Sequence, residues 1–228
     1  MNVDITTIPL GFGQCYLLRA SGVVAVDAGA PKKGKQFFRA LESAASRPED
    51  LKLLILTHGH WDHIGSAAEI KASTTAKIAM HRSEVSWLEN SLTPLSPGVT
   101  AWGKILTAMH KPFMPLIDVP AASVDIVLDD DAYPLMDYGI PGHILHTPGH
   151  SPGSVSVLLE SGEAFVGDLA MNRLPLRFSP GLPIFADDPS AVIRSWEILL
   201  ERGAAMIYPA HGKPFPASII RRAISRHL

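Results

Sequence analysis

Short apolar runs, separated by polar turns and by stretches with helical spacing, occupy most of the chain. Runs of a few apolar or β-branched residues, bounded by glycine or polar residues, predict β-strands. These expected strands are residues 5–10, 14–20, 22–29, 51–57, 75–81, 125–129, 142–147, 154–160, 163–168 and 204–211. Apolar residues three or four positions apart predict helices. The expected helices are residues 32–45, the second half of 58–72, 190–203 and 216–228.

Residues 83–120 have a different pattern from the rest of the chain. They place several prolines between amphipathic stretches and carry little strand signal, which predicts helices in an insertion. Strands and helices interleave on both sides of this insertion, as is typical of the α/β class. No Gly/Ser-rich linker interrupts the chain, so we expect one domain over residues 1–228.

Composition narrows the possible functions. Of the 228 residues, 46% are hydrophobic, which is enough for a sizeable core. The 20 basic and 22 acidic residues give a net charge of −2, so we expect neither nucleic acid nor a membrane surface as a partner. The one cysteine, Cys15, excludes an internal disulfide and is expected in the core of a protein from a reducing compartment. The N-terminal residues show no signal-peptide pattern, so we expect a cytoplasmic protein.

The strongest chemical signal is the segment His-Gly-His-Trp-Asp-His at residues 58–63, directly after an apolar run. In an extended segment, residues two apart point the same way, so His58 and His60 can reach one ion together. Asp62 and His63 follow on the turn and can face a second ion. Imidazole and carboxylate groups suit zinc, and also iron or manganese.

Three further polar residues stand at the ends of expected strands. His150 lies in the segment 146–154, Asp168 ends the run 163–168, and His211 ends the run 204–211. Loops at one end of a sheet converge in space, so we expect these side chains to join the histidine segment. Together they supply seven ligands, which is enough for two closely spaced ions.

These motifs resemble the metallo-β-lactamase superfamily. The family pattern is H-x-H-x-D-H, then H, then D, then H, and all seven positions match in order between residues 58 and 211. The resemblance implies an αββα sandwich, in which two mixed β-sheets pack face to face, helices lie outside, and metals lie at one rim.

The resemblance also implies a role for each residue. The first metal would be held by His58, His60 and His150. The second would be held by Asp62, His63 and His211, and Asp168 would bridge the two. Asp27, in the segment Val-Asp-Ala-Gly, matches an early strand-end aspartate of the family and would support the histidine loop.

The implied activity is that of a binuclear metal-dependent hydrolase. Two ions share a water, lower its pKa towards neutrality, and so make a bridging hydroxide available. The hydroxide would attack a small ester-like substrate, which is a thioester, a lactone or a phosphoester. Asp62 and Asp168 are the expected catalytic carboxylates, with Asp62 or a metal-bound water protonating the leaving group.

Departures from particular branches narrow the resemblance. True β-lactamases of the superfamily lack an aspartate at the Asp168 position, which favours a glyoxalase II-like or lactonase-like branch. The Gly-Cys-Gly string of glyoxalase II and the persulfide dioxygenases is absent after Asp168, and Met171 stands where acyl-homoserine lactonases have tyrosine. The alternatives are a mononuclear iron oxygenase of the sulfur dioxygenase type, a weak β-lactamase and a non-catalytic binding module.

The insertion and the segment after Asp168 are expected to shape a pocket for a small-molecule substrate. The candidate pocket residues are Phe113, Met171, Arg173 and Arg177. Large apolar residues of the insertion need cover, namely Trp87, Leu88, Trp102, Met109, Phe113 and Met114. We favour ordinary packing of these helices on the sheet, while a lid over the metals or a homodimer surface remains open. The acidic run 129–131 is expected to be a solvated turn.

Overall fold

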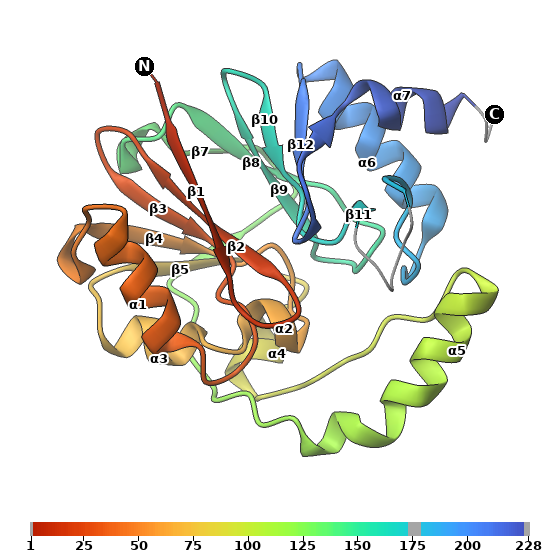
Figure 1. Ribbon diagram of the computed structural model, residues 1–228, viewed down its shortest axis with the longest axis horizontal. Helices are drawn as coiled ribbons and strands as arrows, with labels where there is room; N and C mark the ends of the chain where they lie inside the picture. Colours follow the sequence, from red (N-terminus) through yellow and green to blue (C-terminus); the bar gives the residue numbers. More distant parts are fainter. Residues whose placement is uncertain (1, 173–178, 226–228) are drawn as a thin grey trace.

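The computed structural model describes residues 2–172 and 179–225, and these form four layers (Figure 1). The first sheet has the strand order β1 (Asp4–Pro9), β2 (Gln14–Arg19), β3 (Val23–Val26), β4 (Leu51–Ile55), β5 (Lys77–His81), β6 (Ile126–Leu128). The second has the order β14 (Phe215–Pro216), β12 (Met206–Tyr208), β10 (Glu163–Phe165), β9 (Val155–Leu159), β8 (Gly142–His146), β7 (Tyr133–Pro134). Both sheets mix parallel and antiparallel pairs, as expected.

Helices cover the outer face of each sheet. Helices α1 (Gly34–Ser43) and α3 (Ala67–Ala72) lie on the first sheet, and α6 (Pro189–Glu201) and α7 (Ser218–Ile224) lie on the second (Figure 1). The short helix α2 (Trp61–Ile64) and the 3-10 helices η1 (Pro48–Asp50) and η3 (Met136–Tyr138) lie in connections. The predicted αββα sandwich is confirmed.

Alternation along the buried strands explains the layers. In β2, Cys15 and Leu17 pack with α1 and α3, whereas Tyr16 and Leu18 pack between the two sheets. Successive side chains of a strand point to opposite faces, so a strand that is apolar at every position is buried on both. Cys15 is 1% exposed, which confirms its expected place in the core.

The rim that carries the polar loops follows from the strand directions. Strands β3, β4, β5 and β6 run parallel, and β10 runs parallel to β12. The loops after β4, β10 and β12 therefore leave their sheets at the same end, and the connection from β8 to β9 joins them there. A small two-stranded sheet, β11 (Met171–Asn172) with β13 (His211–Gly212), closes this end.

The insertion is helical as expected, but its two halves pack differently. Helix α4 (Val85–Glu89) buries Leu88 in the core of the first sheet, as predicted. Helix α5 (Ala101–His110) and η2 (Lys111–Leu116) instead form an arm set apart from both sheets (Figure 1).

For α5, the prediction of helix-on-sheet packing is wrong. This helix packs through Leu106 on Met171 and Ile184, while Met109 remains 59% exposed. The contact is with loops at the rim because the segment before α5 pairs with residues 184–186, through Val99 N to Ile184 O at 2.9 Å and Ala186 N to Pro97 O at 3.1 Å. Among the helices in the described part of the chain, none has the length and apolar character needed to cross a bilayer.

Candidate metal centre

The rim brings all seven predicted ligand side chains together. Three sets of donor atoms lie within 4.8 Å of one another: His58, His60 and His150; His58, His63 and Asp168; and Asp62, His63 and His211. We call these seven residues the rim centre. All are buried except Asp62, whose side chain is 14% exposed. The sets share His58 and His63, so they form one continuous cluster.

Each of the five histidines has one ring nitrogen in contact with a neighbouring oxygen. His58 Nδ1 lies 3.1 Å from Thr57 Oγ1, His60 Nε2 lies 3.4 Å from Ser96 Oγ, His63 Nδ1 lies 2.9 Å from Asp27 Oδ2, His150 Nδ1 lies 2.8 Å from Phe185 O, and His211 Nδ1 lies 3.2 Å from Phe12 O. Such a contact fixes the orientation of an imidazole and leaves its second nitrogen for another partner.

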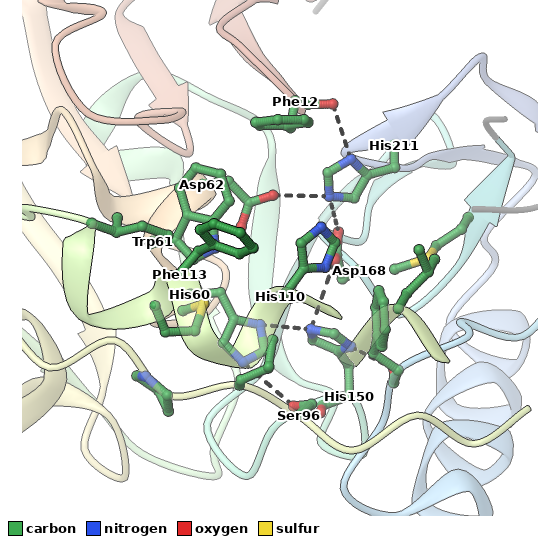
Figure 2. Close-up of a pocket in the computed structure, with 17 residues that line it drawn as sticks. Phe12, His60, Trp61, Asp62, Ser96, His110, Phe113, His150, Asp168 and His211 are labelled. Carbon is green, nitrogen blue, oxygen red and sulfur yellow. Dashed lines mark hydrogen bonds and ion pairs between the residues drawn. The ribbon is translucent and has the colours of Figure 1, made fainter. Parts of the chain in front are cut away.

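The second nitrogens face the interior of the rim centre. His150 Nε2 lies 3.0 Å from His60 Nδ1, and His211 Nε2 lies 3.2 Å from Asp168 Oδ1 and 3.3 Å from Asp62 Oδ2 (Figure 2). Three buried atoms there, His58 Nε2, His63 Nε2 and Asp168 Oδ1, have no hydrogen-bond partner, although some lie at ion-pair distance. A buried polar atom without a partner costs about 1–3 kcal/mol.

This donor set fits divalent metal ions. Imidazole nitrogens and carboxylate oxygens are the ligands of zinc, iron and manganese sites, and a bound ion would satisfy the buried atoms that lack a partner. Ring nitrogens already held by Asp27 and by backbone carbonyls are the usual support of metal-binding histidines.

Charge divides the centre into two halves. Burial, followed by repulsion from His150, lowers the pKa of His60 to about 3, and burial also lowers the pKa of His58 and His150. Burial would lower the pKa of His211 too, but the charges of Asp168 and Asp62 outweigh it and raise this pKa to about 10.

Without metal, one half therefore holds neutral imidazoles and the other holds imidazolium beside carboxylates. Burial would lower the pKa of His63, but the charge of Asp27 and the other nearby carboxylates outweigh it and raise this pKa. For Asp62, burial raises the pKa, but His63 and His211 outweigh it and lower the pKa to about 2.

Asp27 occupies the supporting position that the resemblance implies for it. Its carboxylate accepts hydrogen bonds from Thr57 N at 2.8 Å and Thr57 Oγ1 at 2.9 Å, and it holds His63. Its φ of 65° is unusual for a residue other than glycine, and the surrounding bonds maintain this backbone conformation.

Glu84 is a further buried residue that sequence reasoning missed. It is 0% exposed, and its carboxylate accepts hydrogen bonds from Gly59 N at 2.5 Å and from Gly153 N at 2.6 Å. Gly59 lies between His58 and His60, and Gly153 lies in the loop that carries His150. Glu84 thus joins two loops that supply histidines, and no motif around it in the sequence indicates this.

A pocket with a volume of about 650 Å³ opens onto the rim centre (Figure 2). Phe113 and Met171 line it, as the sequence suggested, whereas the other two candidates, Arg173 and Arg177, lie outside the described residues. His60, Asp62, His150, Asp168 and His211 form its floor.

The model of one known family matches most of the chain. The metallo-beta-lactamase superfamily model covers residues 8–211 and so includes every residue of the rim centre. The chain belongs to this superfamily. A solved relative in it, a metallo-beta-lactamase family protein from Thermus thermophilus, has a TM-score of 0.70 and 20% identity over 99% of this chain and 79% of its own. That likeness shows the fold.

Several curated relatives of this superfamily member carry hydrolase names. Probable metallo-hydrolase YflN from Bacillus subtilis (strain 168) is 28% identical over 146 residues, covering 63% of this chain and 53% of that protein. Hydroxyacylglutathione hydrolase GloC from Haemophilus influenzae is 26% identical over 172 residues, covering 74% of this chain and 72% of that protein. The matched region spans about half the length of some relatives, namely 53% of YflN and 48% of probable metallo-hydrolase YqgX from Bacillus subtilis.

Proposed function

We propose that this protein is a hydrolase that uses two divalent metal ions, zinc in the first instance, on a small ester-like substrate. One observation carries the proposal: each of the five rim histidines is held through one nitrogen and presents the other to a common centre with two carboxylates. The names of the relatives YflN and GloC support a hydrolytic activity, and the second also supports a thioester substrate.

The residues have distinct duties in this proposal. His58, His60 and His150 would hold one ion, and Asp62, His63 and His211 would hold the other. Asp168 would contact both, because its two carboxylate oxygens face different histidines, Oδ1 towards His211 at 3.2 Å and Oδ2 towards His150 at 3.7 Å. Bound ions of this kind supply hydroxide at neutral pH and polarise the oxygen that is attacked.

Asp62 is the carboxylate placed to move a proton. It lines the pocket and is the most exposed member of the rim centre. It would take a proton from the attacking water at a carboxylate oxygen and return it to the leaving group. Asp62 Oδ2 lies 3.3 Å from His211 Nε2, so the two atoms are close enough to bind one ion.

Metal analysis combined with a substrate panel tests the proposal. The purified chain is loaded with zinc, its metal content is measured, and thioester, lactone and phosphoester substrates are assayed in parallel. We expect two zinc ions per chain and hydrolysis of at least one class. One iron per chain with oxygen uptake would instead identify a mononuclear oxygenase. Full metal loading without any hydrolysis would identify a binding module.

A further inference from the structure

The wall of the pocket differs sharply in chemistry from its floor. Beyond the rim centre, the described lining is almost wholly apolar, and it includes no lysine or arginine. Its apolar side chains include Phe12, Trp61, Leu106, Phe113, Met114 and Met171. Ser96 and His110 are its other polar members. A ligand that fills this space therefore meets the polar rim centre at one end and mainly hydrocarbon, with His110 of α5, along its length.

The insertion supplies much of this wall and is held in place. Leu106 is 8% exposed and packs on Met171 and Ile184. Gly103 lies so close to Ile184 that an added Cβ would collide with its carbonyl oxygen, so α5 approaches that loop as only glycine allows. The side chain of Thr100 caps α5 by accepting a hydrogen bond from Gly103 N at 2.9 Å.

Aromatic residues form the wall near the entrance. Phe12 packs edge-on against Trp61 with ring centroids 5.5 Å apart, and both line the pocket beside Asp62. Phe113 lies on η2 and lines the pocket (Figure 2). It is 61% exposed. The apolar lining thus extends from the rim centre to the surface of the molecule.

From this arrangement we infer that the substrate is an uncharged ester, thioester or lactone with a medium-length apolar acyl chain. This inference rests on the proposed hydrolase function. The carbonyl lies at His60, Asp62 and Asp168, and the acyl chain runs along α5 and η2. A volume of about 650 Å³ is in the range of pockets that enclose a small molecule. A substrate with several carboxylates would meet no basic side chain in the described lining.

A series of esters with acyl chains of increasing length measures the preference for chain length directly. The zinc-loaded full chain is assayed with p-nitrophenyl esters from acetyl to decanoyl, below the concentration at which they aggregate. Burying one methylene changes binding by about fourfold, so we expect kcat/KM to rise about two- to fourfold per methylene until the pocket is full, chiefly through a lower KM. A flat series, with acetyl ester hydrolysed as well as decanoyl ester, would overturn the chain preference and leave the hydrolase intact. No hydrolysis at any length would count against the hydrolase itself.

Two variants test where the acyl chain of the substrate lies. Phe113→Ala removes a pocket residue, so the ratio of decanoyl to acetyl kcat/KM should fall at least fivefold. Leu116→Ala is the matched control, because Leu116 lies on the same 3-10 helix, is 78% exposed and does not line the pocket. The control should keep the wild-type ratio. Equal ratios in both variants would place the acyl chain elsewhere.

Binding without turnover gives a separate readout. Calorimetry compares decanamide, hexanamide and acetamide as uncharged ligands, and the affinity should rise in the order of chain length. The decanoyl thioester of glutathione tests the headgroup, because it carries two carboxylates. A kcat/KM for that thioester tenfold or more above that for an uncharged decanoyl thioester would overturn the assignment of an uncharged substrate.

Discussion

Two clusters in this protein contain the same residue types and behave differently. The rim centre combines five histidines with two aspartates. A second group, His81, Asp130 and His146, also brings its donor atoms within 4.8 Å of one another, and we call it the edge cluster. It joins β5 of the first sheet to β8 of the second through the turn after β6.

The edge cluster is satisfied by the protein itself. Asp130 Oδ1 lies 3.2 Å from His81 Nε2 and 3.1 Å from His146 Nδ1, and Arg82 Nη2 lies 2.8 Å from Asp130 Oδ2. The two imidazole rings stack with centroids 4.0 Å apart and planes 9° apart.

The comparison teaches that residue type alone does not make a metal site. In the edge cluster a permanent cation, Arg82, already binds the carboxylate, and the side chain of Asp130 is 59% exposed. In the rim centre the ion-pair partners of Asp62 and Asp168 among the described residues are imidazoles, and three buried atoms lack a hydrogen bond. A metal ion is bound most favourably where buried ligand atoms are already oriented and have no other partner.

The largest expected effect comes from removing a rim ligand. His60→Ala or Asp168→Ala should lower metal content and reduce activity by more than ~100-fold, which exceeds the usual effect of residues that only orient a ligand. The overall fold should survive, because the αββα core does not depend on the rim. Elemental analysis, initial rates and circular dichroism measure the three quantities. Full metal occupancy in both variants would refute the assignment of the centre.

Loss of the buried carboxylate at Glu84 should have the next largest effect. Glu84→Ala leaves the Gly59 and Gly153 amides without their acceptor, at a cost of about 1–3 kcal/mol each, and should weaken metal binding by about 10- to 100-fold. Zinc titration and chemical unfolding measure these effects.

Glu89→Ala is the matched control for Glu84. Glu89 is an exposed residue of α4, the helix that follows Glu84. Its carboxylate accepts a hydrogen bond from Val124 N at 3.1 Å, and Val124 does not belong to a loop that carries a rim histidine. Its loss should leave zinc affinity unchanged. If both variants bind zinc as wild type does, Glu84 has no part in positioning the histidines.

The stability of the metal-free protein should depend on pH in two opposite ways. His211 has a pKa of about 10 when folded against about 6.5 when unfolded, so its contribution is present below pH 6.5 and is lost as pH rises towards 10. His60 has a pKa of about 3, so its contribution is present above pH 6.5 and is lost as pH falls towards 3.

Melting temperatures of wild type and His211→Gln across this range test the assignment. We expect the metal-free variant to lose much of the decline at alkaline pH while keeping the decline at acidic pH. An unchanged alkaline decline in the variant would show that His211 is not the group that titrates.

The smallest expected effect is at the edge cluster. Asp130→Ala removes an exposed carboxylate whose ion pairs are partly screened by solvent, so zinc content should stay at the wild-type value and activity within about twofold. Elemental analysis and the same rate assay measure this. Loss of one metal equivalent would make the edge cluster a second metal site and remove the contrast between the clusters.

Much of the fold and of the site could be predicted from the sequence. Residues 51–57 are almost all apolar because β4 is buried on both faces, and this local pattern also indicates where His58 follows. The H-x-H-x-D-H spacing and the polar residues at strand ends indicated the seven members of the rim centre, and the resemblance to the superfamily added Asp27. The strands that escaped prediction, β7, β11, β13 and β14, have two residues each and exist only through their partners.

Tertiary structure alone decided three other features. Glu84 contacts Gly153 across 69 positions of the chain, α5 rests on a rim loop instead of a sheet, and Arg82 satisfies Asp130. The order of buried and exposed positions is a local property of the chain, so the sequence determined the layers and the donors. The partners of Glu84 and Asp130 lie on segments that are distant in sequence and are brought close only by packing. The tertiary structure therefore decided these contacts.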